Sequence, residues 1–286
     1  MIQRSTIQLL RFPFSFFLMP VYWFALSQVV RPHPGRSILI FLIIHILLYP
    51  SSNGFNSYMD RDEGSIGGLK SPLPPTRQLL YVSMAMDGLA ILLGLFISIY
   101  FSIATFIYIL ASRAYSARTI RLKKFPLTGY GTVVICQGAL IFFMVYHGAH
   151  EPTTLRVPVL GMISASLLIG GFYPLTQIYQ HAADAKDGVK TISAWLGIRS
   201  TFIFCGIVYG MAFAMLAFFF LESLEIKEFL VLTTCILPIL VYYIKWAIQV
   251  WRNPSLADFS HTMRMNTIAS VCTNLGFIIV FLMQYM

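Results

Sequence analysis

The sequence predicts an all-α, polytopic membrane protein: one transmembrane domain over residues 1–286 that crosses the bilayer nine times. Of the 286 residues, 57% are hydrophobic and only 11% are charged, whereas a soluble domain carries about 25% charged residues. The chain also offers nine apolar segments close to the roughly 20 residues that a spanning helix needs. These features argue against a soluble enzyme, a disordered protein and a secreted disulfide scaffold.

The nine predicted spans are apolar runs separated by charged or Pro- and Gly-containing loops. In chain order they cover residues 12–30, 37–55, 79–97, 98–114, 126–146, 157–178, 200–220, 229–248 and 265–285. Only a SIYFS stretch divides the third from the fourth, which predicts a tight turn there. The first is too long and aromatic for a cleaved signal, and no small-residue cleavage site follows it. Asp87, inside the third span, is expected to hydrogen-bond between helices, and the Gly206-x-x-x-Gly210 pair in the seventh permits close helix packing.

The distribution of basic residues predicts the orientation of these spans. With the N-terminus in the cytoplasm, 16 of the 20 Lys and Arg residues fall in inner segments and 4 in outer ones. This bias favours nine spans, a cytoplasmic N-terminus and a multi-pass protein of the cell's inner (plasma) membrane. The net charge of +9 is then explained by inner loops facing anionic lipid. No basic run alternates with aromatic residues on a polar segment, so no nucleic-acid partner is expected.

Two inner loops, at about residues 53–78 and 178–199, carry acidic motifs with the same spacing. The first reads NSYMDRDEG from Asn56 and the second QHAADAKDG from Gln180. Both give an amide, three residues, Asp, two residues, an acid and Gly. The matched acids are Asp60 with Asp184 and Glu63 with Asp187. Because the two preceding spans point the same way, the motifs indicate a parallel internal repeat with a site between its halves.

Helix geometry suggests what these motifs do. At about 100° per residue, positions i, i+4 and i+7 share one face of a helix. The predicted metal ligands are therefore Asn56, Asp60 and Glu63 in the first motif and Gln180, Asp184 and Asp187 in the second. Asp62 would point away from that face. Two facing rows of oxygen ligands suit Mg²⁺, which keeps waters and substrate phosphates as its other ligands. The alternative is that these are ordinary solvated loop charges.

A third inner loop, at about residues 113–126, concentrates positive charge. It reads AYSARTIRLKKFP and contains Arg121, Lys123 and Lys124. Lysine and arginine bind phosphate, and arginine adds bidentate geometry. Topology alone also places basic residues in an inner loop, so this patch is less specific than the acidic pair. Together the three loops predict a metal–diphosphate site on one face of the membrane.

These motifs resemble those of the UbiA superfamily of intramembrane prenyltransferases. Its first signature is N-x-x-x-D-x-x-x-D after the second helix, and its second is D-x-x-x-D after the sixth, followed by G-x-K-T. The present chain matches at Asn56, Asp60 and Asp184 and in the DGVKT run that contains Lys190. The SPLPP run from Ser71 and the loop with Tyr115 are also similar. The resemblance extends over nearly the whole chain.

The resemblance implies transfer of an isoprenyl group from an isoprenyl diphosphate to a lipophilic acceptor, usually an aromatic ring such as a quinone precursor. The reaction would depend on Mg²⁺ and take place in a central cavity between the helices, within the lipid bilayer. Asp60 and Asp184 would be the catalytic acids. The diphosphate would contact Arg121, Lys123, Lys124, Lys190 and Tyr115. Tyr115 could instead be a packing residue or an interface anchor, and Arg11 could either reach the diphosphate or anchor the first span.

The chain departs from the family pattern at two acidic positions, which are Gly64 and Gln180. We expect Glu63 and Asp187 to replace the missing carboxylates on the same helix faces. Two alternatives remain: a degenerate homologue that binds prenyl diphosphate without turnover, and a cation-coupled transporter that uses Asp60 and Asp184. A transporter should carry its ionisable residues near the membrane midplane, whereas these lie at the inner rim, which favours the enzyme.

Overall fold

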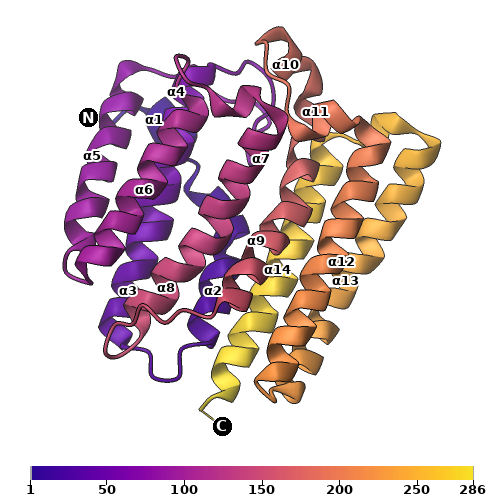
Figure 1. Cartoon of the computed structure of the whole chain (residues 1–286). Helices are drawn as coiled ribbons and strands as arrows, with labels where there is room; N and C mark the ends of the chain where they lie inside the picture. The colour runs from indigo at the N-terminus through magenta and orange to yellow at the C-terminus, as the bar shows by residue number, and fades with distance from the viewer. Residues whose placement is uncertain (1, 286) are drawn as a thin grey trace.

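The computed structural model describes residues 2–285, and nearly all of them are helical (Figure 1). Long rods of helix, several with a change of helix type along their length, make up the molecule. The N-terminal rods are α1 (Arg4–Leu10), η1 (Phe12–Leu18) and α2 (Met19–Ser27), then α3 (Pro34–Phe41), η2 (Leu42–Leu48) and α4 (Tyr49–Asp60). Next come α5 (Arg77–Gly94), α6 (Ile99–Ser116) and the short η3 (Leu122–Lys124), followed by α7 (Pro126–Val134), η4 (Ile135–Leu140) and α8 (Ile141–Ala149).

The C-terminal half begins with α9 (Val159–Phe172), η5 (Tyr173–Gln180) and α10 (His181–Lys186), which form one rod. After the short α11 (Ile192–Leu196), the chain ends with α12 (Ile198–Glu222), α13 (Ile226–Arg252), η6 (Pro254–Leu256) and α14 (Phe259–Met283). In Figure 1 the rods lie side by side as one bundle, with α2 against both α8 and α14 and α9 against α12. The chain starts near one end of the bundle and finishes at the other, as an odd number of crossings requires.

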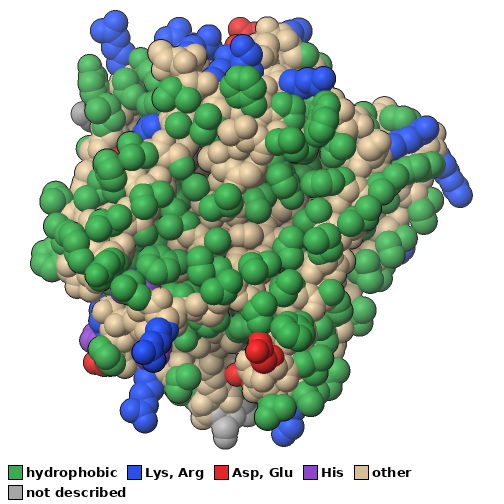
Figure 2. All heavy atoms as spheres, viewed as in Figure 1, with side chains coloured by type: hydrophobic (Ala, Val, Ile, Leu, Met, Phe, Trp, Pro, Cys, Tyr) green, Lys and Arg blue, Asp and Glu red, His purple; other side chains and the backbone are tan. Residues whose placement is uncertain are grey.

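Seven helical segments are long and apolar enough to cross a membrane, which confirms a multi-pass membrane protein. They are Arg4–Ser27, Pro34–Asp60, Pro126–Ala149, Val159–Lys186, Ile198–Glu222, Ile226–Arg252 and Phe259–Met283. The two other predicted spans are the 18-residue helices α5 and α6, which carry Asp87 and Arg113. The count of nine crossings therefore stays a prediction. Figure 2 shows charged side chains mainly at the two ends of this face, with a hydrophobic surface between them.

The polar residues of α5 and α6 neutralise each other inside the bundle. Arg113 forms an ion pair with Asp87, whose other carboxylate oxygen accepts a hydrogen bond from Ser51 of α4. The Arg113 guanidinium also lies 4.0 Å from the centre of the Phe55 ring. Paired charges with aromatic cover can stay in a low-dielectric interior. The predicted helix-to-helix role of Asp87 is thus confirmed, and it joins three helices.

Packed aromatic side chains close one half of the bundle. Phe24 of α2 stacks on Phe277 of α14 at 4.7 Å between ring centres, and Phe142 of α8 lies 5.0 Å away. Phe219 of α12 completes the group at 5.9 Å from Phe24. Such pairs stabilise a core beyond the area they bury. The half of the bundle that carries the loops after α4, α6 and α10 has polar residues between its helices instead. It is called here the inner end, because the sequence predicts that these loops face the cytoplasm.

Candidate active site

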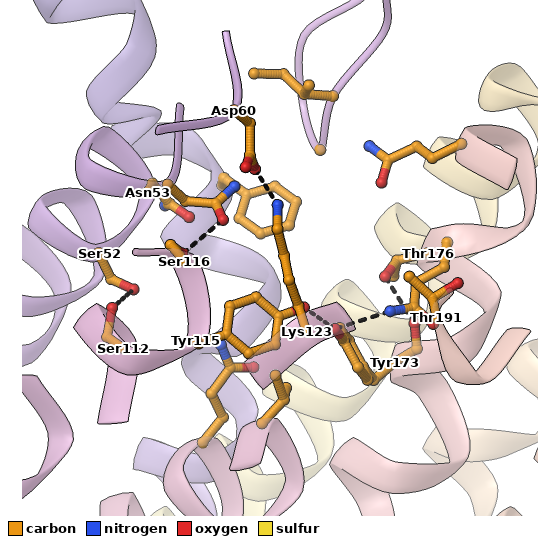
Figure 3. Close-up of a pocket in the computed structure, with 18 of the residues that line it drawn as sticks. Ser52, Asn53, Asp60, Ser112, Tyr115, Ser116, Lys123, Tyr173, Thr176 and Thr191 are labelled. Atoms are coloured by element: carbon orange, nitrogen blue, oxygen red, sulfur yellow. Dashed lines mark hydrogen bonds and ion pairs between the residues drawn. The ribbon is translucent and has the colours of Figure 1, made fainter. Parts of the chain in front are cut away.

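A polar cavity of about 190 Å³ lies at the inner end, between α4, α6, α7, η4, η5 and α10 (Figure 3). Its wall carries three carboxylates, those of Asp60, Asp62 and Asp184, and two basic side chains, those of Arg11 and Lys123. The matched aspartates Asp60 and Asp184 are 124 residues apart in the sequence, and the fold brings both to one cavity. This is the meeting of the two loops that the sequence predicts.

The first acidic loop leaves helical geometry directly after Asp60. Arg61 takes a left-handed conformation with φ of 55°, and its N–H donates to the Ser57 carbonyl at 3.1 Å, which ends α4. Asn56 and Asp60 share the cavity face, as predicted, and Ser116 donates a hydrogen bond to the Asn56 amide oxygen at 2.8 Å. The two residues are therefore oriented by α4 and α6 together.

The predicted positions of Glu63 and Asp62 are wrong, because the angular argument needed α4 to continue past Asp60. Glu63 is exposed and is not part of the cavity wall; it lines an adjoining groove at the inner end, to which Asp60, Asp62 and Gln180 also contribute. Asp62 is partly buried and lines the cavity with Asp60. Asp62, and not Glu63, is therefore the second carboxylate that the first acidic loop brings to the cavity. The metal-ligand role of Glu63 stays a prediction, because its side chain does not line the cavity.

The pKa of the Asp62 carboxyl is shifted by its place in the cavity wall. Burial raises the pKa of the Asp62 carboxyl above its ordinary value of 3.8, and the Asp60 carboxylate raises it further. Lys123 and Arg11 lower the same pKa. A raised carboxyl pKa means that the ionised form is short of stabilising partners in the free protein. A cation bound between the aspartates would supply that stabilisation.

The second acidic loop follows a 3-10 segment rather than a regular α-helix. Gln180 ends η5 and Asp184 lies on α10, and both side chains line the cavity. Asp187 lies just past the end of α10; it does not line the cavity but lines the adjoining groove. It forms an ion pair with Arg121, and Arg118 approaches it at 3.9 Å. The prediction that Asp187 shares the cavity face with Gln180 and Asp184 is therefore wrong, since the helix ends first.

The oxygen atoms at the cavity suit a hard divalent cation that also binds a phosphorylated substrate. Within residues 2–285, Asp184 Oδ2 and Asp60 Oδ1 are buried without a hydrogen-bond partner, although Asp60 Oδ1 lies 3.6 Å from the Arg121 guanidinium. A buried carboxylate oxygen without a hydrogen bond is costly. Among residues 2–285, no three His, Cys, Asp or Glu side chains lie close enough to form a ready-made metal cluster. Mg²⁺ does not require one, because it is held by one or two carboxylates together with waters and phosphates.

The basic loop divides into buried and exposed cations. Lys123 is 9% exposed and forms an ion pair with Asp60 across the cavity (Figure 3). Arg121 lies behind it, 3.6 Å from Asp60 and paired with Asp187. Lys124 and Lys190 are exposed and are absent from the cavity wall. Their predicted contacts with diphosphate have no support in the structure, and Thr191 faces the cavity in place of Lys190.

Arg11 is a cavity residue whose role the sequence left open. It is 8% exposed, and its guanidinium donates to the carbonyls of Gly67 and Asn53, both at 3.3 Å. A Cβ at Gly67 would lie 2.7 Å from the Phe14 ring and 3.3 Å from the Arg11 guanidinium, so this approach needs glycine. The placement favours contact with a bound anion and not anchoring at the membrane surface.

Tyrosines and neutral polar groups form the rest of the wall. The hydroxyls of Tyr115 and Tyr173 are hydrogen-bonded, and Gln177 donates to Tyr173 at 2.8 Å (Figure 3). Farther from the inner end lie Tyr108 and Gln137, the latter on the π-helical segment η4. Such π segments often occur at functional sites. The sequence analysis missed Tyr108, Tyr173 and Gln137, because nothing in their spacing separates them from packing residues.

Comparison with known proteins identifies similar chains. The model of the UbiA prenyltransferase family matches residues 17–268. The bacteriochlorophyll synthase 33 kDa chain of Cereibacter sphaeroides is 26% identical over 208 residues, which cover 68% of this chain and 67% of that protein. A UbiA homologue from Archaeoglobus fulgidus, bound to DMAPP and Mg²⁺, superposes with a TM-score of 0.69 at 19% identity, over 97% of this chain and 99% of that one. An apo UbiA homologue from Aeropyrum pernix K1 gives 0.70 at 16% identity, over 94% and 98%.

Proposed function

This chain belongs to the UbiA prenyltransferase family, and we propose that it transfers an isoprenyl group from an isoprenyl diphosphate to a lipophilic acceptor within the membrane. The observation that carries the proposal is the convergence of Asp60, Asp62, Asp184, Lys123 and Arg11 on one cavity. Carboxylates and cations side by side suit a metal-bound diphosphate better than either charge alone. The Archaeoglobus fulgidus relative, whose structure contains DMAPP and Mg²⁺, supports the same chemistry here.

We propose that Mg²⁺ binds at the part of the cavity wall formed by Asp60, Asp62 and Asp184, held by one or two of these carboxylates together with waters and substrate phosphates. The amide oxygens of Asn56 and Gln180 line the same wall. When bound, the metal would neutralise charge on the diphosphate as the C–O bond breaks. Glu63 and Asp187, the other predicted ligands, are left out of this assignment because neither lines the cavity. Asp187 would act indirectly, because its ion pair with Arg121 holds that guanidinium next to Asp60.

The basic side chains of the cavity would stabilise the leaving diphosphate. Lys123 extends into the cavity from η3, and Arg11 is held from the other side by two backbone carbonyls. Both are fixed before substrate binds, so they need little rearrangement when negative charge develops in the transition state. The Lys123 ammonium would exchange part of its contact with Asp60 for phosphate oxygens. Arg121 would support Asp60 from behind.

The aromatic and neutral wall would protect the allylic cation. The Tyr115 and Tyr173 rings lie next to the acids, and a cation over an aromatic face is stabilised electrostatically. The interior beyond them is lined by Tyr108 and apolar groups such as Val133, which limit water near a reactive carbocation. We propose an aromatic, quinone-precursor-like acceptor. Analysis of the membrane lipids lost from a deletion strain would test this acceptor class.

The transporter alternative is disfavoured by the position of the acids. Asp60 is the last residue of α4, and Asp184 lies beyond the end of η5, so both are at the inner end of the bundle. An ion-coupling site is expected near the bilayer midplane at broken helices. A non-catalytic homologue is also disfavoured, because Asp62 brings a third carboxylate to the cavity despite the glycine at position 64.

The test is diphosphate release from geranyl diphosphate by the purified protein with Mg²⁺ and an aromatic acceptor. Asp60→Asn and Asp184→Asn should each lower turnover by about 100-fold or more, because each removes a carboxylate that would hold the metal, and the metal neutralises the diphosphate. Glu222→Gln, at an exposed acid on the opposite end of the bundle, is the matched control. Near-normal turnover in both aspartate variants would exclude the proposed metal site. Binding of the diphosphate without release in the wild-type protein would identify a non-catalytic homologue.

A further inference from the structure

A second cavity, of about 260 Å³, lies between α12, α13, the α9–η5 rod and α14. Its wall is apolar, and none of its lining residues within the described chain is charged. The α12 side is formed around Gly206 and Gly210, and the α13 side around Leu237 and Leu240. Leu175 and Met265 close the back. The active-site proposal above makes no use of this cavity.

The two glycines of α12 open this space instead of bringing two backbones together. A Cβ at Gly206 would lie 3.2 Å from the Tyr243 hydroxyl, a side-chain atom of α13. A Cβ at Gly210 would meet no heavy atom within 4 Å. The Gly206-x-x-x-Gly210 pair therefore leaves a void on the face of α12 that looks toward α13. The residues around an empty apolar void lose packing contacts, which an apolar occupant would restore.

The polar groups around the cavity are already satisfied. Tyr243 donates its hydroxyl hydrogen bond to the Phe202 carbonyl, and Thr233 donates to the Phe229 carbonyl at 2.8 Å. Within residues 2–285, no lining side chain carries a buried nitrogen or oxygen atom without a hydrogen-bond partner. The occupant therefore needs no polar group, because no lining side chain within the described residues has a buried donor or acceptor left to satisfy. These contacts indicate a hydrocarbon chain.

The cavity opens toward the bilayer and is closed toward the active site. Leu237 and Leu240 at its mouth are 51% and 50% exposed. Within residues 2–285, the two cavities share no lining residue, because Phe172 and Leu175 face this one while Tyr173 and Thr176 face the active site. Leu175, between them, is 1% exposed. A tail attached to a diphosphate in the active site has no open route into this space.

The depth of the mouth matches the tail of a lipid and not its head group. Gly210 lies 12 residues into the 25-residue helix α12, which is about 18 Å along a rod of roughly 37 Å. The opening is therefore near the middle of the membrane, where only acyl chains are present. We infer that this cavity is a binding site for one acyl chain of a bilayer phospholipid, held between α12 and α13.

The test uses the full-length protein in nanodiscs that contain phosphatidylcholine with a diazirine midway along one acyl chain. After irradiation, peptides covering residues 205–213 and 236–243 should carry the label. Gly210→Leu should lower that labelling at least about fivefold, because the added side chain occupies the volume of the acyl chain. Gly88→Leu, the same change at an exposed glycine of α5 with open space around it, should leave labelling unchanged. Leu240→Trp narrows the mouth from its exposed side and provides the test if Gly210→Leu does not fold.

Two results would overturn the inference. Wild-type labelling in a folded Gly210→Leu or Leu240→Trp protein would mean that the label reports only lipid around the bundle surface. Loss of labelling when excess geranyl diphosphate and Mg²⁺ are added would mean that the cavity takes the substrate's tail instead. The inference does not depend on catalysis, so an inactive protein that still shows saturable acyl labelling would support it while the proposed function fails.

Discussion

Asp62 lines the cavity and Glu63 does not, which is the reverse of the prediction from helix geometry. Substituting these two neighbours gives the sharpest test of the active-site geometry. Asp62→Asn removes one of three carboxylates from a cavity whose only other charges are Arg11 and Lys123 within the described residues. The formal charge of the wall then changes from −1 to zero. We expect the Mg²⁺ concentration for half-maximal diphosphate release to rise by about 10- to 100-fold. Substitution of residues that only support metal ligands already lowers metal affinity by about this factor.

Glu63→Gln is the matched control, one residue farther along the same loop. Its side chain is exposed and faces the inner-surface groove, so it is screened by water. An exposed charge contributes up to about 1 kcal/mol, which is less than about fivefold in Mg²⁺ affinity. The assay is a Mg²⁺ titration of diphosphate release for both variants and the wild type. A crippled Glu63→Gln with a normal Asp62→Asn would refute the placement of this loop.

Thermal unfolding gives an independent readout of the same substitution. Because burial raises the pKa of the Asp62 carboxyl above 3.8, the folded protein binds this proton more tightly than the unfolded chain. Ionised Asp62 therefore destabilises the metal-free fold at neutral pH, and the penalty disappears as pH falls through the raised pKa. Without Mg²⁺, Asp62→Asn should have a higher Tm than the wild type at pH 7. The difference in Tm between the two proteins should become smaller as the pH falls. A decrease in Tm at pH 7 would mean that Asp62 is a structural group.

Three further predictions test other parts of the structure. Lys123→Met should lower turnover by about 100-fold. Lys124→Met should turn over at near the wild-type rate, because of these two lysines only Lys123 lines the cavity. Equal effects in the two variants would contradict this placement. Asp87→Asn should destabilise the protein by about 3–5 kcal/mol, measured by thermal unfolding in detergent, because it leaves Arg113 unpaired. The double variant with Arg113→Met should recover part of this loss. Additive losses would mean that the two residues are not coupled. Single cysteines in the loops after α4 and α10 should be labelled from the same, cytoplasmic side, and labelling from opposite sides would exclude nine crossings with this orientation.

Much of the fold followed from the sequence, because a bilayer makes composition and charge decisive. Seven predicted spans match helices able to cross a membrane, and the other two match α5 and α6. The sequence also identified Asn56, Asp60, Gln180 and Asp184 as site residues, and all four line the cavity. Their spacing falls within helical turns at or next to helix ends, where periodicity is a reliable guide to which side chains point together.

The tertiary structure alone decided the residues beyond those helix ends. Arg61 turns left-handed and stops α4, so Asp62 enters the cavity and Glu63 leaves it. The spacing rule could not detect this, because it assumes a continuous helix. Likewise, nothing in the loop sequence separates Lys123, which meets Asp60 inside the bundle, from the exposed Lys124. Sequence periodicity describes one helix, whereas the contents of a cavity depend on where several helices end relative to one another.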